Sequence, residues 1–270
     1  MTSNETADAV WSDVQAIRAQ APLVHNITNY VVMNVTANAL LALGASPVMA
    51  HAEDEVEEMA GIARALVLNI GTLSPPWIEA MVKAGRVATR NGRPIILDPV
   101  GAGATRFRTV AAQRLLRDAP PAVIRGNASE IRALYTAEQE TKGVDSTHGS
   151  EDALDAAQAL ARHYDCAVSV SGSTDLIVSA SAVILVSNGH PLMPRVTGLG
   201  CTATALTGAF AAVNPSPLRA AAHAMAVMGI AGEIAATRSA GPGTFQVCFL
   251  DALYLLQESD IRTRLKMEEA

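Results

Sequence analysis

The amino-acid sequence predicts an α/β fold in which helices cover both faces of a largely parallel sheet. Half of the 270 residues are apolar, which is enough for the large core of a single domain. Short β-branched runs alternate with longer amphipathic segments, a pattern typical of β–α–β units. After Gly198 the chain has the pattern of three consecutive helices, which predict an α-rich C-terminal layer.

Five short apolar runs are interpreted as buried strands, at residues 46–49, 65–70, 94–97, 122–124 and 167–170. Five segments with apolar residues at three- and four-residue spacing are interpreted as helices, at residues 28–43, 54–63, 75–91, 128–135 and 151–164. Residues 176–178 and 183–186 are expected to form a hairpin, because only a few small residues separate them.

No linker or block of charge divides the sequence, so residues 1–270 are expected to form one domain. The polar residues 1–6 and the tail at residues 261–270 are expected to be disordered. The charge-free stretch at residues 196–218 contains several glycines and prolines, which favour a buried helix over a membrane span.

Charge and cysteine content restrict the classes of partner. The formal charge of −6 comes without a basic run, which argues against nucleic acid or a membrane surface and favours a small molecule. The three cysteines, Cys166, Cys201 and Cys248, show no metal-binding spacing and no even disulfide set. They favour a reducing cytoplasm.

Ligands of open parallel sheets bind where the strands end, so the loops after the predicted strands are candidate sites. Asp98 ends one strand and is followed by Pro99 and two glycines, which suits either a cation site or a capped turn. Arg125 ends the next strand. Asn127 and Glu130 follow it, at the spacing of a helix cap. Alternatively, these two residues and Arg125 could hold a nucleotide phosphate and hydrated magnesium.

Two further loops are candidates for phosphate contacts. Ser171 ends a strand and offers a hydroxyl, although a serine-rich turn would look the same. Gly198, Leu199, Gly200 and Cys201 precede an apolar helix, where glycines leave backbone N–H groups open to an anion or simply make a tight helix entry. The stretch is neither a Walker loop nor a dinucleotide fingerprint.

Together these loops resemble the ribokinase-like kinases, which carry an NxxE motif and a late GxGD anion hole. Longer motifs narrow the resemblance to the hydroxyethylthiazole kinase family over residues 22–256. These are HNITNYV (25–31), LLALGASPVMA (40–50), LVLNIGTL (66–73), ILDPVGAGAT (96–105), IRGNASEI (124–131) and KGVD (142–145).

The resemblance implies ATP-dependent phosphorylation of the hydroxyl of 4-methyl-5-(2-hydroxyethyl)thiazole, in homotrimers with active sites at subunit boundaries. It assigns the thiazole contacts to Met49 and Gly198, and the ATP contacts to Arg125 and Ser171. It assigns Mg²⁺ to Asp98 and Glu130, partly through water. Residues 198–201 match the anion hole, and Cys201 the catalytic position.

Two positions raise questions within this resemblance. Most ribokinase-like enzymes have an aspartate base at the position of Cys201. The thiazole kinases, like this chain, have a cysteine there. A helix N-terminus is expected to lower the pKa of this thiol, whereas apolar surroundings keep it neutral. Leu199 replaces the usual alanine, and we expect the backbone donors to be unaffected. The alternatives are a kinase of another small alcohol, of the hydroxymethylpyrimidine or sugar type, an ATP-dependent dehydratase on the same scaffold, or a silent binding module.

Overall fold

The computed structural model describes residues 3–141 and 153–270. The KGVD motif at residues 142–145 and the expected helix start at residue 151 lie outside the described residues. The helices are α1 (Ser3–Gln20), α2 (Met33–Leu43), α3 (Val56–Ile62), α4 (Pro75–Arg90), α5 (Arg106–Asp118), α6 (Ala128–Thr141), α7 (Ala153–Tyr164), α8 (Leu199–Ala211), α9 (Pro217–Ala236), α10 (Pro242–Leu255) and α11 (Glu258–Arg264), with a 3-10 turn η1 (Met193–Arg195).

One sheet runs through the molecule, in the strand order β2-β1-β3-β4-β5-β6-β7-β8-β9. The strands are β1 (Leu23–Ile27), β2 (Ser46–Val48), β3 (Ala65–Asn69), β4 (Ile95–Asp98), β5 (Val123–Asn127), β6 (Ala167–Ser171), β7 (Asp175–Val178), β8 (Val183–Val186) and β9 (Met267–Glu269). Strands β1 to β6 pair in parallel, and β7 to β9 continue the sheet antiparallel. The predicted, largely parallel sheet is confirmed.

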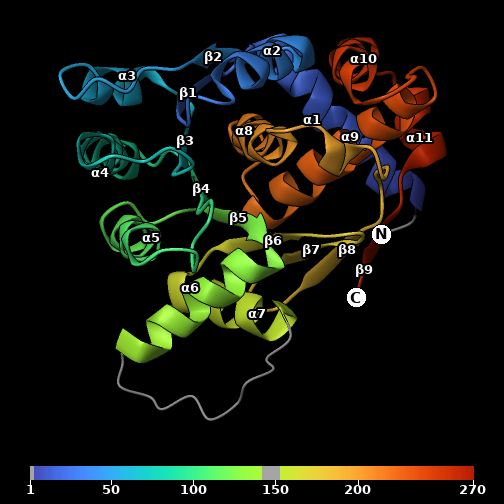
Figure 1. Ribbon diagram of the computed structural model, residues 1–270. Helices are drawn as coiled ribbons and strands as arrows, with labels where there is room; N and C mark the ends of the chain where they lie inside the picture. Colours follow the sequence, from blue (N-terminus) through green and yellow to red (C-terminus); the bar gives the residue numbers. More distant parts are fainter. Residues whose placement is uncertain (1–2, 142–152) are drawn as a thin grey trace.

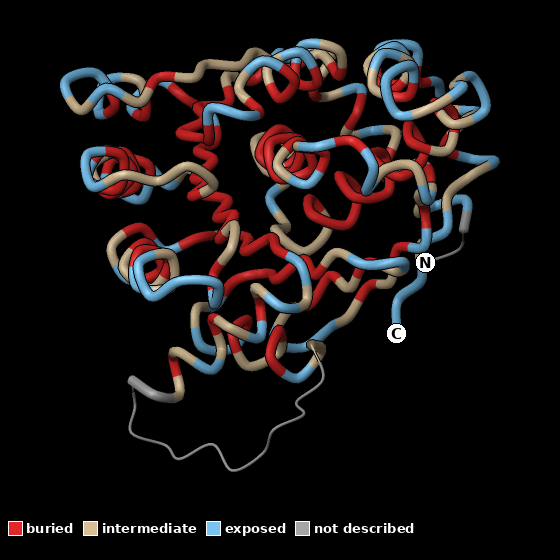
Figure 2. The backbone as a smooth tube through the Cα atoms, in the orientation of Figure 1, coloured by how far each residue is buried: buried red, intermediate tan, exposed pale blue. Residues whose placement is uncertain are grey.

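Helices cover both faces of this sheet, as predicted (Figure 1). Helices α3 to α7 lie on one face and share a core with it, whereas α1, α2 and α8 to α11 form the other layer. Figure 2 shows that the strands and helices α8 and α9 are the most continuously buried parts of the described chain. The α-rich C-terminal layer therefore lies against the sheet and is itself largely buried.

The chain order reverses between β1 and β3, because β1 leads to the edge strand β2 and the chain then returns to β3. A reversal of this kind opens a crevice at the carboxyl ends of the strands, where ligands bind in open α/β sheets. The residues at those ends are Thr28 and Asn29 after β1, Asn69 on β3 and Asp98 on β4.

Several expectations about single elements were wrong. The tail is ordered, since β9 pairs with β8 along residues 267–269, and α1 begins at Ser3. The predicted helix at residues 28–43 begins only at Met33, because β1 occupies residues 23–27 and a turn follows it. Helices α1 and α5 and strand β1 were not predicted, and a short fourth helix, α11, follows the three expected after Gly198.

Helix α8 lies unusually close to the sheet because of Gly208. A Cβ atom at this position would lie 2.7 Å from Val67 Cγ2 and 3.1 Å from Val24 Cγ1, on β3 and β1. The helix is buried from Thr202 to Phe210. No helix in residues 3–141 and 153–270 is long and apolar enough to cross a membrane.

We predict that Gly208→Ala destabilises the protein, because the added methyl group overpacks the contact with β3. The expected loss of unfolding free energy is about 1–3 kcal/mol, measured by chemical denaturation. Gly61 in α3 is a matched control, since nothing lies within 4 Å of an added Cβ there. Gly61→Ala should stabilise the protein by about 0.5–1 kcal/mol, and equal effects of the two substitutions would contradict the packing argument.

Candidate active site

The first turn of α8 presents backbone N–H groups that no helical carbonyl accepts. Gly198 caps the helix with φ of 85°, a left-handed conformation that favours glycine. The first helical hydrogen bond runs from Thr202 N–H to the Gly198 carbonyl, at 2.8 Å. The N–H groups of Leu199, Gly200 and Cys201 therefore remain available to an anion, at the positive end of the helix.

Both glycines of this turn lie close to neighbouring side chains. A Cβ atom at Gly198 would lie 2.6 Å from Val32 Cγ1, so the turn packs directly against the start of α2. A Cβ atom at Gly200 would lie 3.0 Å from Arg125 Nη1. The guanidinium group of Arg125 thus lies over the helix start, as an anion site requires.

Asp98 forms the centre of a hydrogen-bonded network below this turn. Its Oδ2 accepts hydrogen bonds from Asn69 Nδ2 and from the Thr204 hydroxyl, both at 2.7 Å. Burial raises the pKa of Asp98 to about 6, although the charge of Arg125 and these two hydrogen bonds oppose the shift. The carboxyl group is 1% exposed, so its negative charge is poorly solvated without a ligand.

Asn69 connects Asp98 to Cys201. Its Oδ1 accepts a hydrogen bond of 2.8 Å from Asn29 Nδ2, and the same Nδ2 atom lies 3.5 Å from Cys201 Sγ. Burial, with a contribution from the charge of Asp98, raises the pKa of Cys201 to about 11. Of the two alternatives for this thiol, a lowered pKa or a neutral group in apolar surroundings, this shift agrees with the second, because loss of solvent and the nearby carboxylate both raise the pKa. Cys201 is a neutral thiol at pH 7.

A cavity of about 800 Å³ extends from this turn toward α9 and β7. Arg125, Ser171, Gly198, Leu199 and Gly200 are among its lining residues. The Arg125 side chain is 8% exposed, and its Nε has no partner among the described residues. A buried cation with an unused donor is suited to a bound anion.

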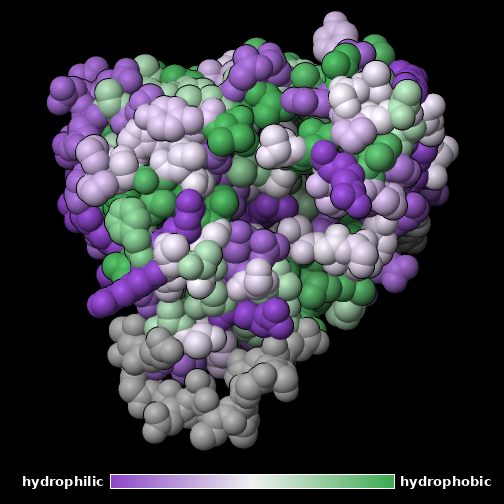
Figure 3. Space-filling view, in the orientation of Figure 1, coloured by the Kyte–Doolittle hydropathy of each residue, from purple (hydrophilic) through white to green (hydrophobic). Residues whose placement is uncertain are grey.

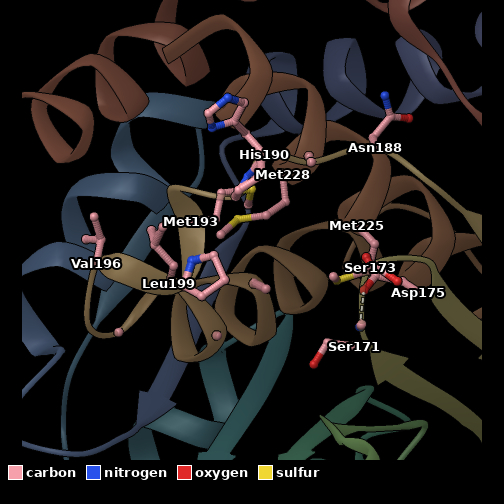
Figure 4. A pocket seen from close by; sticks show the side chains of 18 of the residues that line it. Ser171, Ser173, Asp175, Asn188, His190, Met193, Val196, Leu199, Met225 and Met228 are labelled. Atoms are coloured by element: carbon pink, nitrogen blue, oxygen red, sulfur yellow. Dashed lines mark hydrogen bonds between the residues drawn. The ribbon is translucent and has the colours of Figure 1, made fainter. Parts of the chain in front are cut away.

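Apolar side chains predominate at one end of the cavity and polar side chains at the other, with His190 and Met225 as the respective exceptions (Figure 4). Leu199, Met193 and Met228 lie at one end, whereas Ser171, Ser173 and Asp175 lie toward the other. Burial raises the pKa of Asp175 to about 6, with Arg125 opposing the shift. Figure 3 shows a hydrophilic recess near the centre of the molecular face, beside the position of α8 in Figure 1.

Leu199 is 5% exposed and belongs both to the cavity wall and to the core around α8 and α9. Its side chain is thus shared between the cavity wall and the apolar packing of α8 against α9.

Glu130 makes the capping arrangement that its spacing indicated. Its Oε2 accepts a hydrogen bond from Asn127 N–H, and Asn127 Oδ1 accepts one from Glu130 N–H, both at 2.9 Å. Its Oε1 also accepts a hydrogen bond of 2.9 Å from Gly101 N–H, in the loop after β4. Glu130 thereby joins the loop of Asp98 to the start of α6, with lone pairs left for water.

Met49 lies apart from this cavity, after the edge strand β2. Histidines contact the backbone at Met49 and at the next residue: His51 Nδ1 is 3.3 Å from the Met49 carbonyl oxygen, and His25 Nε2 is 2.7 Å from that of Ala50. The ring of His51 packs against Trp77, and Trp77 against Tyr30, with centroids 4.6 Å and 4.8 Å apart. The structure thus brings together Asp98, Arg125, Ser171 and residues 198–201, but not Met49.

Three polar residues of the site were missed. Asn29, Asn69 and Thr204 carry the hydrogen bonds between Asp98 and Cys201. The available signal was one polar residue at the end of an apolar strand, Asn69 in LVLN. Thr204 gave no signal, since it lies within an apolar helix. Within the described residues, no group of three or more His, Cys, Asp and Glu side chains could hold a metal alone.

Comparisons with known proteins agree on one family. Residues 14–259 match the model of the hydroxyethylthiazole kinase family. Hydroxyethylthiazole kinase of Syntrophus aciditrophicus is 62% identical over 263 residues, covering 97% of each chain, and that of Oleidesulfovibrio alaskensis is 58% identical over 258 residues, covering 96% of this chain and 97% of the other.

Solved structures give the same result. The structure of the hydroxyethylthiazole kinase protein of Pyrococcus horikoshii OT3 is 46% identical, with a TM-score of 0.90 over 97% of this chain and 99% of the other. Pyridoxal kinase of Staphylococcus aureus, solved with pyridoxal, has a TM-score of 0.65 at 18% identity, over 92% of this chain and 97% of the other, which shows a common fold.

We predict that Asp98→Asn stabilises the ligand-free protein at neutral pH. Because the folded-state pKa is raised from 3.8 to about 6, the carboxyl group's contribution to stability is complete below pH 4 and is lost as pH rises through 6. The asparagine side chain has no charge to bury. The free energy of unfolding of the variant should therefore exceed that of the natural protein by up to about 3 kcal/mol at pH 7, and by much less at pH 4.

Urea denaturation at both pH values, without metal or nucleotide, measures this difference. Asp251→Asn, at an exposed position of α10, controls for the loss of one negative charge. A gain at Asp98 that is the same at pH 4 and pH 7 would show that burial of the charge is not its cause.

Proposed function

Because the chain belongs to the hydroxyethylthiazole kinase family, we propose that it transfers the γ-phosphoryl group of ATP to the hydroxyl of 4-methyl-5-(2-hydroxyethyl)thiazole in the cavity at the start of α8. The observation that carries this assignment is the convergence of three N–H groups, at residues 199–201, that have no acceptor among the described residues, with the buried guanidinium group of Arg125. Preorganised donors of this kind stabilise charge that develops on a transferring group.

ATP fits the shape and polarity of the cavity. The triphosphate is assigned to the end with Arg125, Ser171 and the start of α8, where Arg125 Nε and the first N–H groups of the helix have no acceptor among the described residues. The nucleoside is assigned to the rest of the cavity, where Met193, Met225 and Met228 offer an apolar wall. A pocket of a few hundred Å³ or more with few polar groups is typical of small-molecule sites.

Asp98 and Glu130 are suited to Mg²⁺ that arrives with ATP. Magnesium is usually held by one or two carboxylates, water and substrate phosphates, so no dense cluster of ligands is needed. Asp98 is buried with a raised pKa, and an adjacent cation would favour its charged form. Glu130 is committed to two backbone N–H groups and is therefore suited to hold a water of the ion. When bound, Mg²⁺ would neutralise charge on the phosphates.

The thiazole is assigned to the space between the start of α8 and the loop after β1, with contacts from Gly198 and Met49. Met49 lies at the sheet edge and outside the cavity of its own chain. The neighbouring Tyr30 and Val31 are 65% and 63% exposed, which suits burial against a second copy. These features support a homotrimer with sites at subunit boundaries, a state that light scattering would measure.

Three unpaired cysteines support placement in a reducing compartment, which we take to be the cytoplasm.

Cys201 is assigned a positioning role for the substrate alcohol. A thiol with a pKa near 11 has little thiolate at pH 7 to act as a base. Phosphoryl transfer through a loose transition state depends mainly on positioning and electrostatics, so a strong base is not required. The Asn29 amide donates a hydrogen bond to the thiol sulfur and so limits its rotation.

The reaction is tested by an ADP-release assay with Mg²⁺ and a panel of thiazole, pyrimidine and sugar alcohols. The thiazole alcohol should be the preferred acceptor by kcat/KM. Activity on the hydroxymethylpyrimidine alone would assign the chain to another kinase type. ADP release without a phosphorylated product would favour a dehydratase.

We predict that Cys201→Ala lowers kcat by about tenfold and leaves the affinity for the thiazole, measured by calorimetry, within about twofold. Loss of a general base typically costs about 10²–10⁴ in rate. A fall of a hundredfold or more would therefore restore the base role, and an unchanged kcat would remove Cys201 from the reaction. Cys248→Ala, a change of the same kind at a half-buried position of α10, is the control.

A further inference from the structure

Arg108, on the first turn of α5, binds three backbone carbonyl groups that come from two loops of the site. Its Nη1 donates hydrogen bonds to the carbonyl oxygens of Ile70 and Val100, both at 2.8 Å. Its Nη2 donates one to the carbonyl oxygen of Gly71, at 2.7 Å. One planar guanidinium group thus joins the loop after β3 to the loop after β4.

These carbonyl groups lie one or two residues after Asn69 or Asp98, the two residues at the centre of the polar network. Ile70 and Gly71 follow Asn69, and Val100 lies two residues after Asp98. The hydrogen bond between Asn69 and Asp98 is 2.7 Å long and depends on the relative position of these two strand ends. Asn69 Oδ1 also accepts a hydrogen bond from Gly71 N–H, at 2.9 Å, so a shift of residue 71 would be transmitted to the Asn69 amide.

The surrounding chain is built to hold Arg108 in this place. The Thr105 side chain caps α5 by accepting a hydrogen bond from Arg108 N–H, at 3.3 Å. Gly101 has φ of 74°, and a Cβ atom there would lie 3.0 Å from Arg108 Cδ. The glycine therefore permits both the left-handed turn and the passage of the arginine side chain. On the other side of the same loop, Gly101 N–H is held by Glu130.

We propose that Arg108 is a positioning residue for phosphoryl transfer, which fixes the loops of Asn69 and Asp98 relative to each other without contacting substrate. The inference rests on the proposed function for its kinetic consequences, but the geometry that it describes can be tested by metal binding alone. A guanidinium group suits this role because its planar fork of donors reaches several carbonyl groups at once, whereas a lysine ammonium is a compact charge.

The test is Arg108→Met, which keeps an unbranched apolar chain and removes the three hydrogen bonds. Loss of groups that orient metal ligands typically costs about 10–100-fold in metal affinity or activity, and we expect kcat to fall in that range. The KM for the thiazole should remain within about twofold. Binding of Mn²⁺ to the enzyme–ADP complex, followed by electron paramagnetic resonance, should weaken by about tenfold.

Arg114→Met is the matched control on the same helix. Arg114 pairs with Glu79 and Asp118 on the surface, away from the loops of the site. It should lower thermal stability without a comparable change in kcat or in Mn²⁺ affinity. Absence of kinase activity in the natural protein would refute the proposed function. Normal Mn²⁺ affinity in the Arg108 variant would instead refute the role of Arg108.

Two further measurements separate positioning from a general loss of folding. Arg108→Lys should fold and show an intermediate kcat, because one ammonium group cannot replace the whole fork. Millimolar guanidinium ion should restore part of the kcat that Arg108→Ala loses, and it should leave the kcat of Arg114→Ala unchanged. A kcat of Arg108→Met within twofold of the natural protein, or an equal loss in both methionine variants, would overturn the proposal.

Discussion

The close approach of α8 to the sheet determines where every other group of the site can lie. Gly208 allows the helix to lie against β1 and β3, Gly198 allows its first turn to contact Val32, and Gly200 leaves space for Arg125. With the helix in this place, Thr204 reaches Asp98, and Gly198, Leu199 and Gly200 line the cavity. A side chain at any of these glycines would displace the turn or the arginine. The helix position is therefore the constraint on which the donors, the cation and the carboxylate all depend.

Much of the site could be predicted because the rule for parallel sheets locates ligands at strand ends. Asp98, Arg125 and Ser171 are at or near such ends, and their residue types suggested cation and phosphate contacts before the fold was known. Asn69 and Arg108 could not be found in the same way. Their function depends on hydrogen bonds to an amide 40 residues away and to the carbonyl groups of two loops, and no local spacing encodes such contacts.

The errors in the fold prediction have related causes. Strand β1 has the sequence LVHNI, in which His25 and Asn26 are fully buried polar residues that disguise an interior strand. His25 Nε2 contacts the Ala50 carbonyl oxygen and Asn26 donates to the Val24 carbonyl, whereas His25 Nδ1 and Asn26 Oδ1 have no partner among the described residues, so β1 buries polar groups that the sequence pattern counts as solvent-exposed. Strand β9 was missed because a short polar tail becomes a strand only when the edge of β8 is available to it.

The ligand-free site is electrostatically unbalanced in a way that favours its proposed substrates. Asp98 and Asp175 both have pKa values raised by burial, and Arg125 is the cation that opposes both shifts. A thiol at Cys201 adds no charge, whereas a carboxylate there would add a third negative group beside Asp98. A divalent cation would reduce the cost of the buried carboxylates, and the phosphates that accompany it would occupy the unused donors of Arg125 and α8. The same groups that lower the stability of the free protein thus increase the free energy gained when metal and nucleotide bind together.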